Sequence, residues 1–164
     1  GDVYKRQYLE SKLGNLPGLT MPYVPQHTKH VYYVHVINFN ADELNVSRST
    51  FVKALKAELP VTSMREGEGQ LIGEGYVRPL YLLPLFQTQT AYGNRGCAFK
   101  CPHYDGVLNY HAGLCPNTEK AHSSVITHEL MRPPMSHSDL DVVVDAFHKV
   151  YENISALRDW EHAH

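Results

Sequence analysis

Long apolar runs are absent from this sequence, and its Lys and Arg residues form no stripe. The longest apolar stretches are interrupted by proline or histidine and fall short of the ~20 residues that a membrane-spanning helix needs. Fifteen Lys and Arg residues against 17 Asp and Glu residues give a formal net charge of -2. Because nucleic-acid binding depends on clustered cations, we expect neither a membrane nor a nucleic acid as a partner.

Cysteine is scarce in this chain. Cys97, Cys101 and Cys115 make an odd number, and no secretory apolar segment precedes them. Disulfide frameworks belong to secreted proteins with paired cysteines. The sequence therefore favours reduced thiols and a cytoplasmic protein.

The composition is that of a folded domain of ordinary size. Of the 164 residues, 43% are hydrophobic and 20% are charged, which is typical of globular proteins. A chain of this length buries roughly two-thirds of its unfolded surface. We expect one core, with the domain extending over residues 8–158 and a tail over 159–164.

The first residues look unlike the start of a domain. The chain begins with GDVYKRQ, without a methionine and already within a segment of helical spacing. This string resembles the read-through sequence found at the ends of assembled environmental fragments. We expect residues 1–7 to be a non-native leader, with an ordinary trimmed chain as the alternative.

The strongest strand signal lies in HVYYVHVINFN, residues 30–40, where β-branched and aromatic residues predominate. A second short strand is expected over 61–65, followed by a glycine-rich loop over 66–75. One face of the first strand is expected to carry Val31, Tyr33, His35 and Ile37.

Two helices are predicted by their start and stop signals. One follows an N-cap at Ser47 or Ser49 and ends before Pro60. The other begins near Pro116, since proline is tolerated in the first turn, and is expected to continue to Leu130. A short extended piece is then expected up to the prolines of LMRPPM.

The last helix has the clearest signal. Ser136 and Asp139 form a capping box, and an apolar stripe follows from Leu140 to Ile154. Between the predicted strands and this helix, residues 87–114 read as a long polar and aromatic loop, and loops of this length are usually functional or disordered. The order of elements predicts an α+β fold with a small antiparallel or mixed sheet covered by helices.

Seven motifs follow one another along the chain in an order that is known from one family. They are LPGLTMP, HVYYVHVINF, FVKALKAELPV, GYVRPLYLLPLF, CPNTEK, MRPPM and SHSDLDVVVDAFHKV. In this order they resemble the C-terminal small domain of the DegT/DnrJ/StrS family of pyridoxal-phosphate-dependent sugar aminotransferases. The resemblance covers nearly the whole chain after residue 7 and implies the C-terminal domain fold of fold type I aminotransferases.

The resemblance also implies an activity that this chain does not carry alone. Family members hold pyridoxal phosphate on a lysine of a large domain, and that domain is missing here. REGEGQ, residues 65–70, resembles the segment after that lysine only by chance, because no lysine lies just upstream. We expect the fragment to be inactive. The full-length enzyme is expected to be a homodimer that aminates a keto-sugar nucleotide or keto-cyclitol, with glutamate or glutamine as donor.

The segment GYVRPLYLLPLF is the expected wall of the substrate pocket. Tyr76, Arg78 and Tyr81 are polar-tipped residues able to face a substrate. Tyr81 stands where many family members have histidine, which puts a proton-relay role at this position in doubt. The alternative for each residue is packing alone, or a solvated cation in the case of Arg78. Core positions are expected at Leu80, Leu83, Leu85 and Phe86.

Glu119, in CPNTEK, falls at the start of a predicted helix. A carboxylate is favoured there by the unpaired N–H groups and the helix dipole, which is a sufficient structural explanation. The resemblance adds a possible role in substrate binding. The scattered histidines are expected to be ordinary core or surface residues; they are His27, His30, His35, His122, His128 and His137.

A second reading comes from the segment CAFKCPHYDGVLNYHAGLC, residues 97–115. It carries thiols and imidazoles, and tetrahedral zinc takes four such ligands. Zinc would supply folding energy to a loop with little apolar content. The alternative function is therefore a non-catalytic binding module with a zinc-stabilised loop. The candidate ligands are Cys97, Cys101, His103 and Cys115, with His111 nearby.

Overall fold

The computed structural model describes residues 2–60, 70–75, 78–93, 96–130 and 135–164. The chain divides into two compact units. The first is formed by Gly1–Gly75 together with Ser124–His164, and the second by Tyr76–Ser123. The second unit is thus an insertion within the first, a division that the sequence analysis did not predict.

The first unit contains a four-stranded antiparallel sheet. Its strands are β1 (Leu19–Thr20), β2 (His35–Phe39), β3 (Ile72–Gly73) and β4 (Val125–His128). The strand order is β1-β2-β4-β3. Central strands β2 and β4 pair so that His35 lies opposite His128 and Ile37 opposite Ile126. The fold class is α+β, as the sequence predicted.

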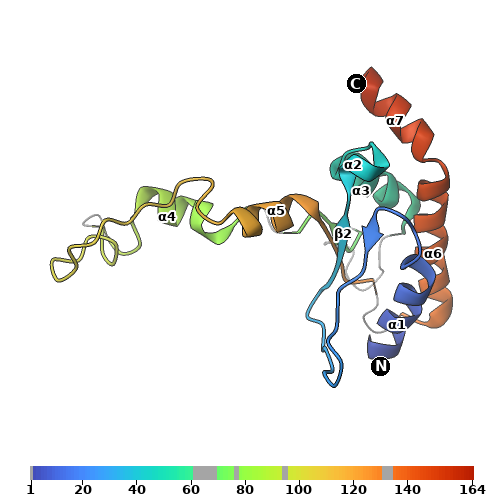
Figure 1. The fold of residues 1–164 in the computed structure, drawn as a ribbon, viewed down its shortest axis with the longest axis horizontal. Coiled ribbons are helices and arrows are strands. Elements are labelled where there is room, and N and C mark those ends of the chain that lie inside the picture. Colours follow the sequence, from blue (N-terminus) through green and yellow to red (C-terminus); the bar gives the residue numbers. More distant parts are fainter. Residues whose placement is uncertain (1, 61–69, 76–77, 94–95, 131–134) are drawn as a thin grey trace. The chain divides into compact units, whose positions relative to one another are not determined.

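Helices cover one face of this sheet. The helices of the first unit are α1 (Asp2–Leu13), α2 (Ala41–Leu44), α3 (Arg48–Glu58), α6 (His137–Glu152) and α7 (Ile154–Ala163), of which α1, α3 and α6 lie over the sheet and α7 packs on α3 and α6. Figure 1 shows α1, α3 and α6 on the same side of β2. The alternation along β2 agrees, because His35, Ile37 and Phe39 are buried whereas Asn38 between them is exposed.

The helix caps that the sequence predicted are present. The Ser47 hydroxyl accepts a hydrogen bond from the backbone N–H of Thr50 at 3.1 Å, which makes Ser47 the N-cap of α3. At the start of α6, Ser136 and Asp139 form the reciprocal capping box. Such caps satisfy N–H groups that have no partner within the helix. Both helices therefore begin where their local sequence directs.

The hydrophobic core lies between the sheet and these helices. Aromatic rings link the layers, with centroids 5.0 Å apart for Phe39 and Phe51 and 6.4 Å apart for Phe51 and Phe147. Leu9 of α1 and Leu140 of α6 are also fully buried. The core therefore joins residues from both segments of the first unit.

Three predictions for the first unit need correction. The strand predicted over 30–40 begins only at His35, and Val31 and Tyr33 are exposed. Residues 125–128 form β4 rather than the end of a helix, because β-branched side chains pair well with β2. The glycine-rich segment contributes the edge strand β3. The strand predicted over 61–65 and residues 131–134 of LMRPPM lie outside the described residues.

The C-terminal stripe is divided between two helices. Asn153 ends α6, and α7 then continues to Ala163. Residues 159–163, predicted as a tail, belong to this last helix. No described helix is at once long and apolar enough to cross a membrane.

The second unit consists of short helices and loops. They include the 3-10 helix η2 (Leu80–Leu82), α4 (Pro84–Thr88) and α5 (Pro116–Ser124), whose last residue belongs to the first unit. The prediction that Leu80 and Leu85 are core residues is wrong, since both are exposed. Leu83 and Phe86 are half-buried. Proline at the start of α4 and α5 fits the tolerance for proline in a first turn.

The core assignment makes a prediction about stability. Phe147→Ala should lower the free energy of unfolding by about 3–5 kcal/mol, because it removes a fully buried ring and leaves a cavity. The matched control on the same helix is Val142→Ala, whose side chain is exposed and whose loss should change stability by less than about 0.5 kcal/mol. Urea unfolding of both variants measures this, and equal effects would contradict the assignment.

Candidate functional site

Two of the residues expected to bind substrate are in direct contact in the second unit. The Tyr81 hydroxyl donates a hydrogen bond to Oε1 of Glu119. The backbone N–H of Gly113 donates to the same carboxylate oxygen at 2.6 Å. Tyr81 comes from η2, and Glu119 comes from the first turn of α5. Residues 38 positions apart in the sequence thus form one polar site.

The hydrogen bonds fix the protonation of this pair. Burial, and next the bond to Glu119, raise the pKa of Tyr81 above its ordinary value. The Tyr81 hydroxyl, followed by the Gly113 N–H, lowers the pKa of Glu119. At neutral pH the pair is therefore a neutral phenol beside a carboxylate. The site offers hydrogen-bond acceptors to a ligand rather than a titrating group.

Other residues that were predicted to line the substrate pocket are not part of this contact. Arg78 is exposed, and no ion pair is found for it within the described part of the chain. Tyr76 lies outside the described residues. Lys120 follows Glu119 but is exposed, whereas a Schiff-base lysine is activated by desolvation or a neighbouring cation. The described residues of this site therefore do not fit the covalent attachment of pyridoxal phosphate.

The loop over 87–114 is held by amide side chains and by rings. Gln87 Nε2 donates to the carbonyl oxygens of Tyr81 at 2.8 Å and of Tyr110 at 2.6 Å. Phe86, Phe99 and Tyr110 form an aromatic cluster with centroids 5.2 to 6.1 Å apart. The Gln87 bonds connect the loop directly to the segment that carries Tyr81.

The four candidate zinc ligands do not come together. Cys97, Cys101 and Cys115 are free thiols, of which Cys97 is exposed. Across the part of the chain that the structure describes, no group of three or more His, Cys, Asp or Glu residues is arranged to hold a metal ion. Cys97, Cys101, His103 and Cys115 are therefore not brought together as a metal-binding group in the described residues.

A buried histidine pair in the first unit was missed by sequence reasoning. His35 and His128, called here the histidine pair, are each 1% exposed. His35 Nδ1 lies 2.6 Å from His128 Nε2, and His35 Nε2 lies 3.1 Å from Oε1 of Glu10. The burial of His35 was indicated by the sequence, because His35 falls on the apolar face of a predicted strand. His128 gave none, because its segment was assigned to a helix.

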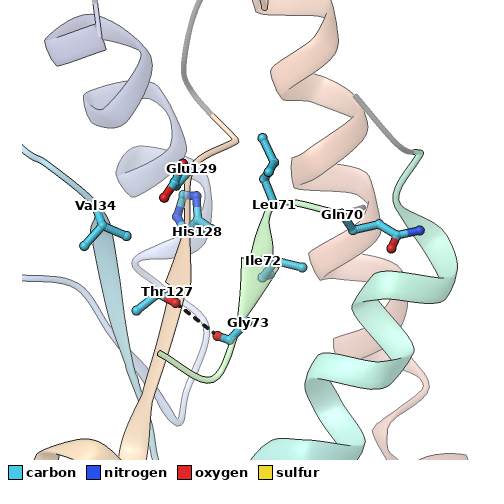
Figure 2. A pocket seen from close by; sticks show the side chains of 8 residues that line it. All are labelled: Val34, Gln70, Leu71, Ile72, Gly73, Thr127, His128 and Glu129. Atoms are coloured by element: carbon cyan, nitrogen blue, oxygen red, sulfur yellow. Dashed lines mark hydrogen bonds between the residues drawn. The ribbon is translucent and has the colours of Figure 1, made fainter. Parts of the chain in front are cut away.

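A pocket of about 160 Å³ adjoins His128 at the edge of the sheet. Figure 2 shows its lining side chains, with the Thr127 hydroxyl bonded to the carbonyl oxygen of Gly73 at 3.4 Å. Val34 from the segment before β2 and Glu129 after β4 complete the wall. The pocket is small and shallow compared with the several hundred Å³ of a typical ligand site.

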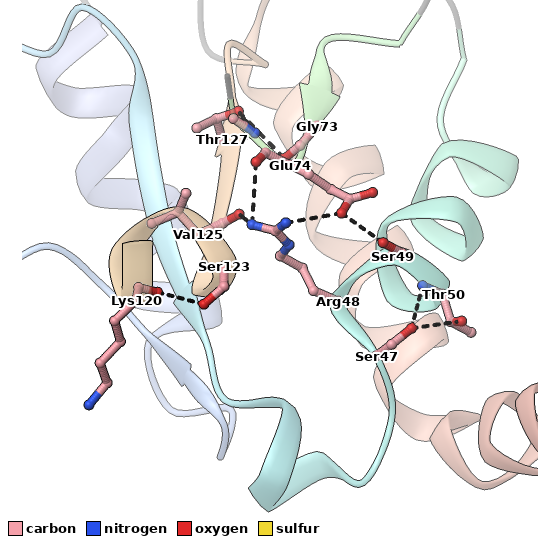
Figure 3. Close-up of polar contacts among 11 residues, drawn as sticks. Ser47, Arg48, Ser49, Thr50, Gly73, Glu74, Lys120, Ser123, Val125 and Thr127 are labelled. Atoms are coloured by element: carbon pink, nitrogen blue, oxygen red, sulfur yellow. Dashed lines mark hydrogen bonds and ion pairs between the residues drawn. The ribbon is translucent and has the colours of Figure 1, made fainter. Parts of the chain in front are cut away.

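A polar cluster lies where the chain leaves the first unit and returns to it. Arg48, at the start of α3, donates to the carbonyl oxygens of Val125 at 2.9 Å and of Glu74 at 3.3 Å, and pairs with the Glu74 carboxylate at 3.1 Å (Figure 3). The Ser49 hydroxyl donates to the same carboxylate at 2.7 Å. One guanidinium group therefore holds the outgoing and returning segments of backbone together.

The chain was compared with models of protein families and with known proteins. No family model matches the chain. The chain is similar to the uncharacterized protein MJ1066 of Methanocaldococcus jannaschii, with 25% identity over 136 residues. The alignment covers 83% of this chain and 28% of that protein. The chain thus spans little more than a quarter of the length of the relative that it matches.

The Arg48 cluster makes a second stability prediction. Arg48→Met keeps much of the aliphatic stem but removes three charge-assisted contacts, and we expect a loss of about 2–4 kcal/mol. The control is Lys53→Met on the exposed face of α3, with a change below about 0.5 kcal/mol. Hydrogen exchange should show faster exchange over 70–75 and 124–128 in Arg48→Met only. Unchanged exchange there would show that the cluster does not hold the two segments.

Proposed function

We propose that this chain is the C-terminal small domain of a pyridoxal-phosphate-dependent aminotransferase that acts on a keto-sugar nucleotide or keto-cyclitol. The observation that carries the proposal is the contact between Tyr81 and Glu119. These residues come from two of the motifs, GYVRPLYLLPLF and CPNTEK, that resemble the DegT/DnrJ/StrS family. The α+β fold with its small antiparallel sheet agrees with the domain that the family resemblance implies.

The role of this domain is to bind and orient the substrate. Glu119 is held in place by the Tyr81 hydroxyl and the Gly113 N–H, which leaves its second oxygen for a donor on the ligand. Sugar and cyclitol hydroxyls are such donors, and a hydrogen bond to a charged group contributes about 1.5–3 kcal/mol. The pair would thus select a polyhydroxylated substrate and fix its orientation.

Tyr81 and Arg78 have different tasks in this proposal. Because burial and the bond to Glu119 raise the pKa of Tyr81, the phenol keeps its proton at neutral pH. It positions Glu119 and offers its own oxygen as an acceptor. Arg78 is exposed, so its guanidinium is accessible to a phosphate of a nucleotide-linked sugar, a pairing that Arg forms in bidentate geometry.

The cofactor belongs to another part of the proposed enzyme. Pyridoxal phosphate supplies the electron sink for amino transfer when it is bound, and the lysine that holds it would lie in a large domain. That domain and a second subunit are the expected partners, and the cytoplasm the expected location. The similarity to a segment of a much longer protein is compatible with such an arrangement.

The proposal predicts the kinetics of variants in the full-length protein that contains this segment. Glu119→Gln, Tyr81→Phe and Arg78→Ala should each lower kcat/KM for amination of a keto-sugar nucleotide by about tenfold to a hundredfold. Their thermal midpoints should stay close to that of the parent. The assay uses glutamate or glutamine as donor and pyridoxal phosphate in excess.

Tyr104→Phe is the matched control for this series. Tyr104 lies in the same unit and is 56% exposed, so its hydroxyl should have no effect on kcat/KM. Full activity in Glu119→Gln and Tyr81→Phe would overturn the substrate-binding role. A full-length protein without any lysine adduct of pyridoxal phosphate after borohydride reduction would overturn the proposed reaction itself.

A further inference from the structure

A chain of polar side chains connects α1 with the centre of the sheet. Arg6 forms an ion pair with Glu10 along α1. Oε1 of Glu10 lies 3.1 Å from Nε2 of His35, whose Nδ1 lies 2.6 Å from Nε2 of His128. The guanidinium of Arg6 also lies over the ring of Tyr32, 4.8 Å from its centroid. Helix α1 is therefore fastened to the sheet by a mostly buried polar network as well as by its leucines.

The geometry fixes where the protons of the histidine pair lie. The Glu10 carboxylate is an acceptor, so Nε2 of His35 carries the proton that faces it. In a neutral His35, Nδ1 is then an acceptor, and Nε2 of His128 donates to it. Nδ1 of His128 is left as a bare acceptor, and the described residues provide no hydrogen-bond partner for it. Both imidazoles are neutral in this arrangement.

An additional proton on the histidine pair would find the Glu10 carboxylate already engaged, because Glu10 forms an ion pair with Arg6. The charged or titratable groups around the histidine pair, in the described residues, are Arg6 and Glu10 on α1, His30 and Tyr32 before β2, and Glu129 after β4. Arg6 and Glu10 neutralise each other, and β3 contributes only the apolar side chain of Ile72 opposite His128. A proton added at Nδ1 of His128 would form a buried N–H group with no acceptor in the described residues, on a ring that is then charged, which is costly.

We propose that the histidine pair is an acid-sensitive latch that holds α1 on the sheet. Above the ordinary histidine range both rings are neutral and the network from Glu10 to His128 is complete. When the pH falls, the open form, in which α1 has left the sheet and the rings meet water, takes up protons that the closed form excludes. Acidification thus releases α1 and uncovers the part of β2 and β4 that carries the histidine pair.

The direction of the pH dependence follows from linkage. Burial lowers the pKa of His35, although the bond to Glu10 acts in the opposite direction, and burial lowers the pKa of His128 well below its usual range. A group whose pKa is lower in the closed form stabilises that form above its ordinary value of about 6.5 and loses this contribution as the pH falls. The opening constant should rise by about tenfold per pH unit for each histidine that takes up a proton.

Nitrogen NMR of the imidazoles tests the closed state directly. At neutral pH both rings of the pair should be neutral Nε2–H tautomers. An imidazolium at either position, or an Nδ1–H tautomer of His35, would overturn the proposal. This measurement needs no substitution and so does not depend on whether a variant folds.

Hydrogen exchange of the 164-residue protein tests the release of α1. After correction for intrinsic rates, the opening constant of α1 amides should rise by at least about tenfold per unit below about pH 6.5, and that of α6 amides should rise much less. His128→Gln keeps an N–H donor toward His35 but does not titrate, so it should reduce the pH slope for α1 by about one proton.

His162→Gln is the matched control, because His162 is exposed on α7, and its slope should equal that of the parent. If the opening constant of α1 amides depended on pH in His128→Gln as steeply as in the parent, the latch would be overturned. Equal opening of α1 and α6 at every pH would also overturn it, since acid would then unfold the whole unit. The latch does not depend on the proposed aminotransferase function, and neither outcome bears on that function.

Discussion

The pairing of β2 with β4 is the contact on which the rest of the first unit depends. It joins residues 93 positions apart in the chain and brings helix α6 over the same face as α1 and α3. This register places Ile37 and Ile126 on the same face of the sheet. The aromatic contacts among Phe39, Phe51 and Phe147 are packed against that face. The outer strands β1 and β3 are two residues long and depend on this central pair.

Elements with local signals were predictable from the sequence, and elements that need a distant partner were not. The starts of α3 and α6 follow from Ser47 and from the capping box, because a cap acts within four residues. Residues 125–128 carry helical and extended signals in one short run, and pairing with β2 decides between them. The edge strand β3 forms by pairing with β4. Its own residues carry no strand signal, and the glycines around it therefore predicted a loop.

The candidate site shows the same limit. The motif resemblance singled out Tyr81 and Glu119, and the structure joins them, whereas no pattern gave the Gly113 N–H that holds the carboxylate. The histidine pair was out of reach because its two members belong to different segments. In the sequence, Arg48 is only one cation on an amphipathic helix. Its role depends on the carbonyl oxygens of Glu74 and Val125, which are distant in the chain and meet at its guanidinium only in the fold.

The insertion of the second unit into a connection of the sheet has a consequence for how this protein can vary. The second unit makes up about half of the separation between the two paired strands. The entropic cost of closing a loop rises only with the logarithm of the loop length, by about 0.6 kcal/mol for each doubling. The sheet would therefore be little affected by a shorter or longer insert, provided that the insert enters and leaves beside Arg48. The scaffold of the first unit would thus tolerate wide variation in the length of this segment.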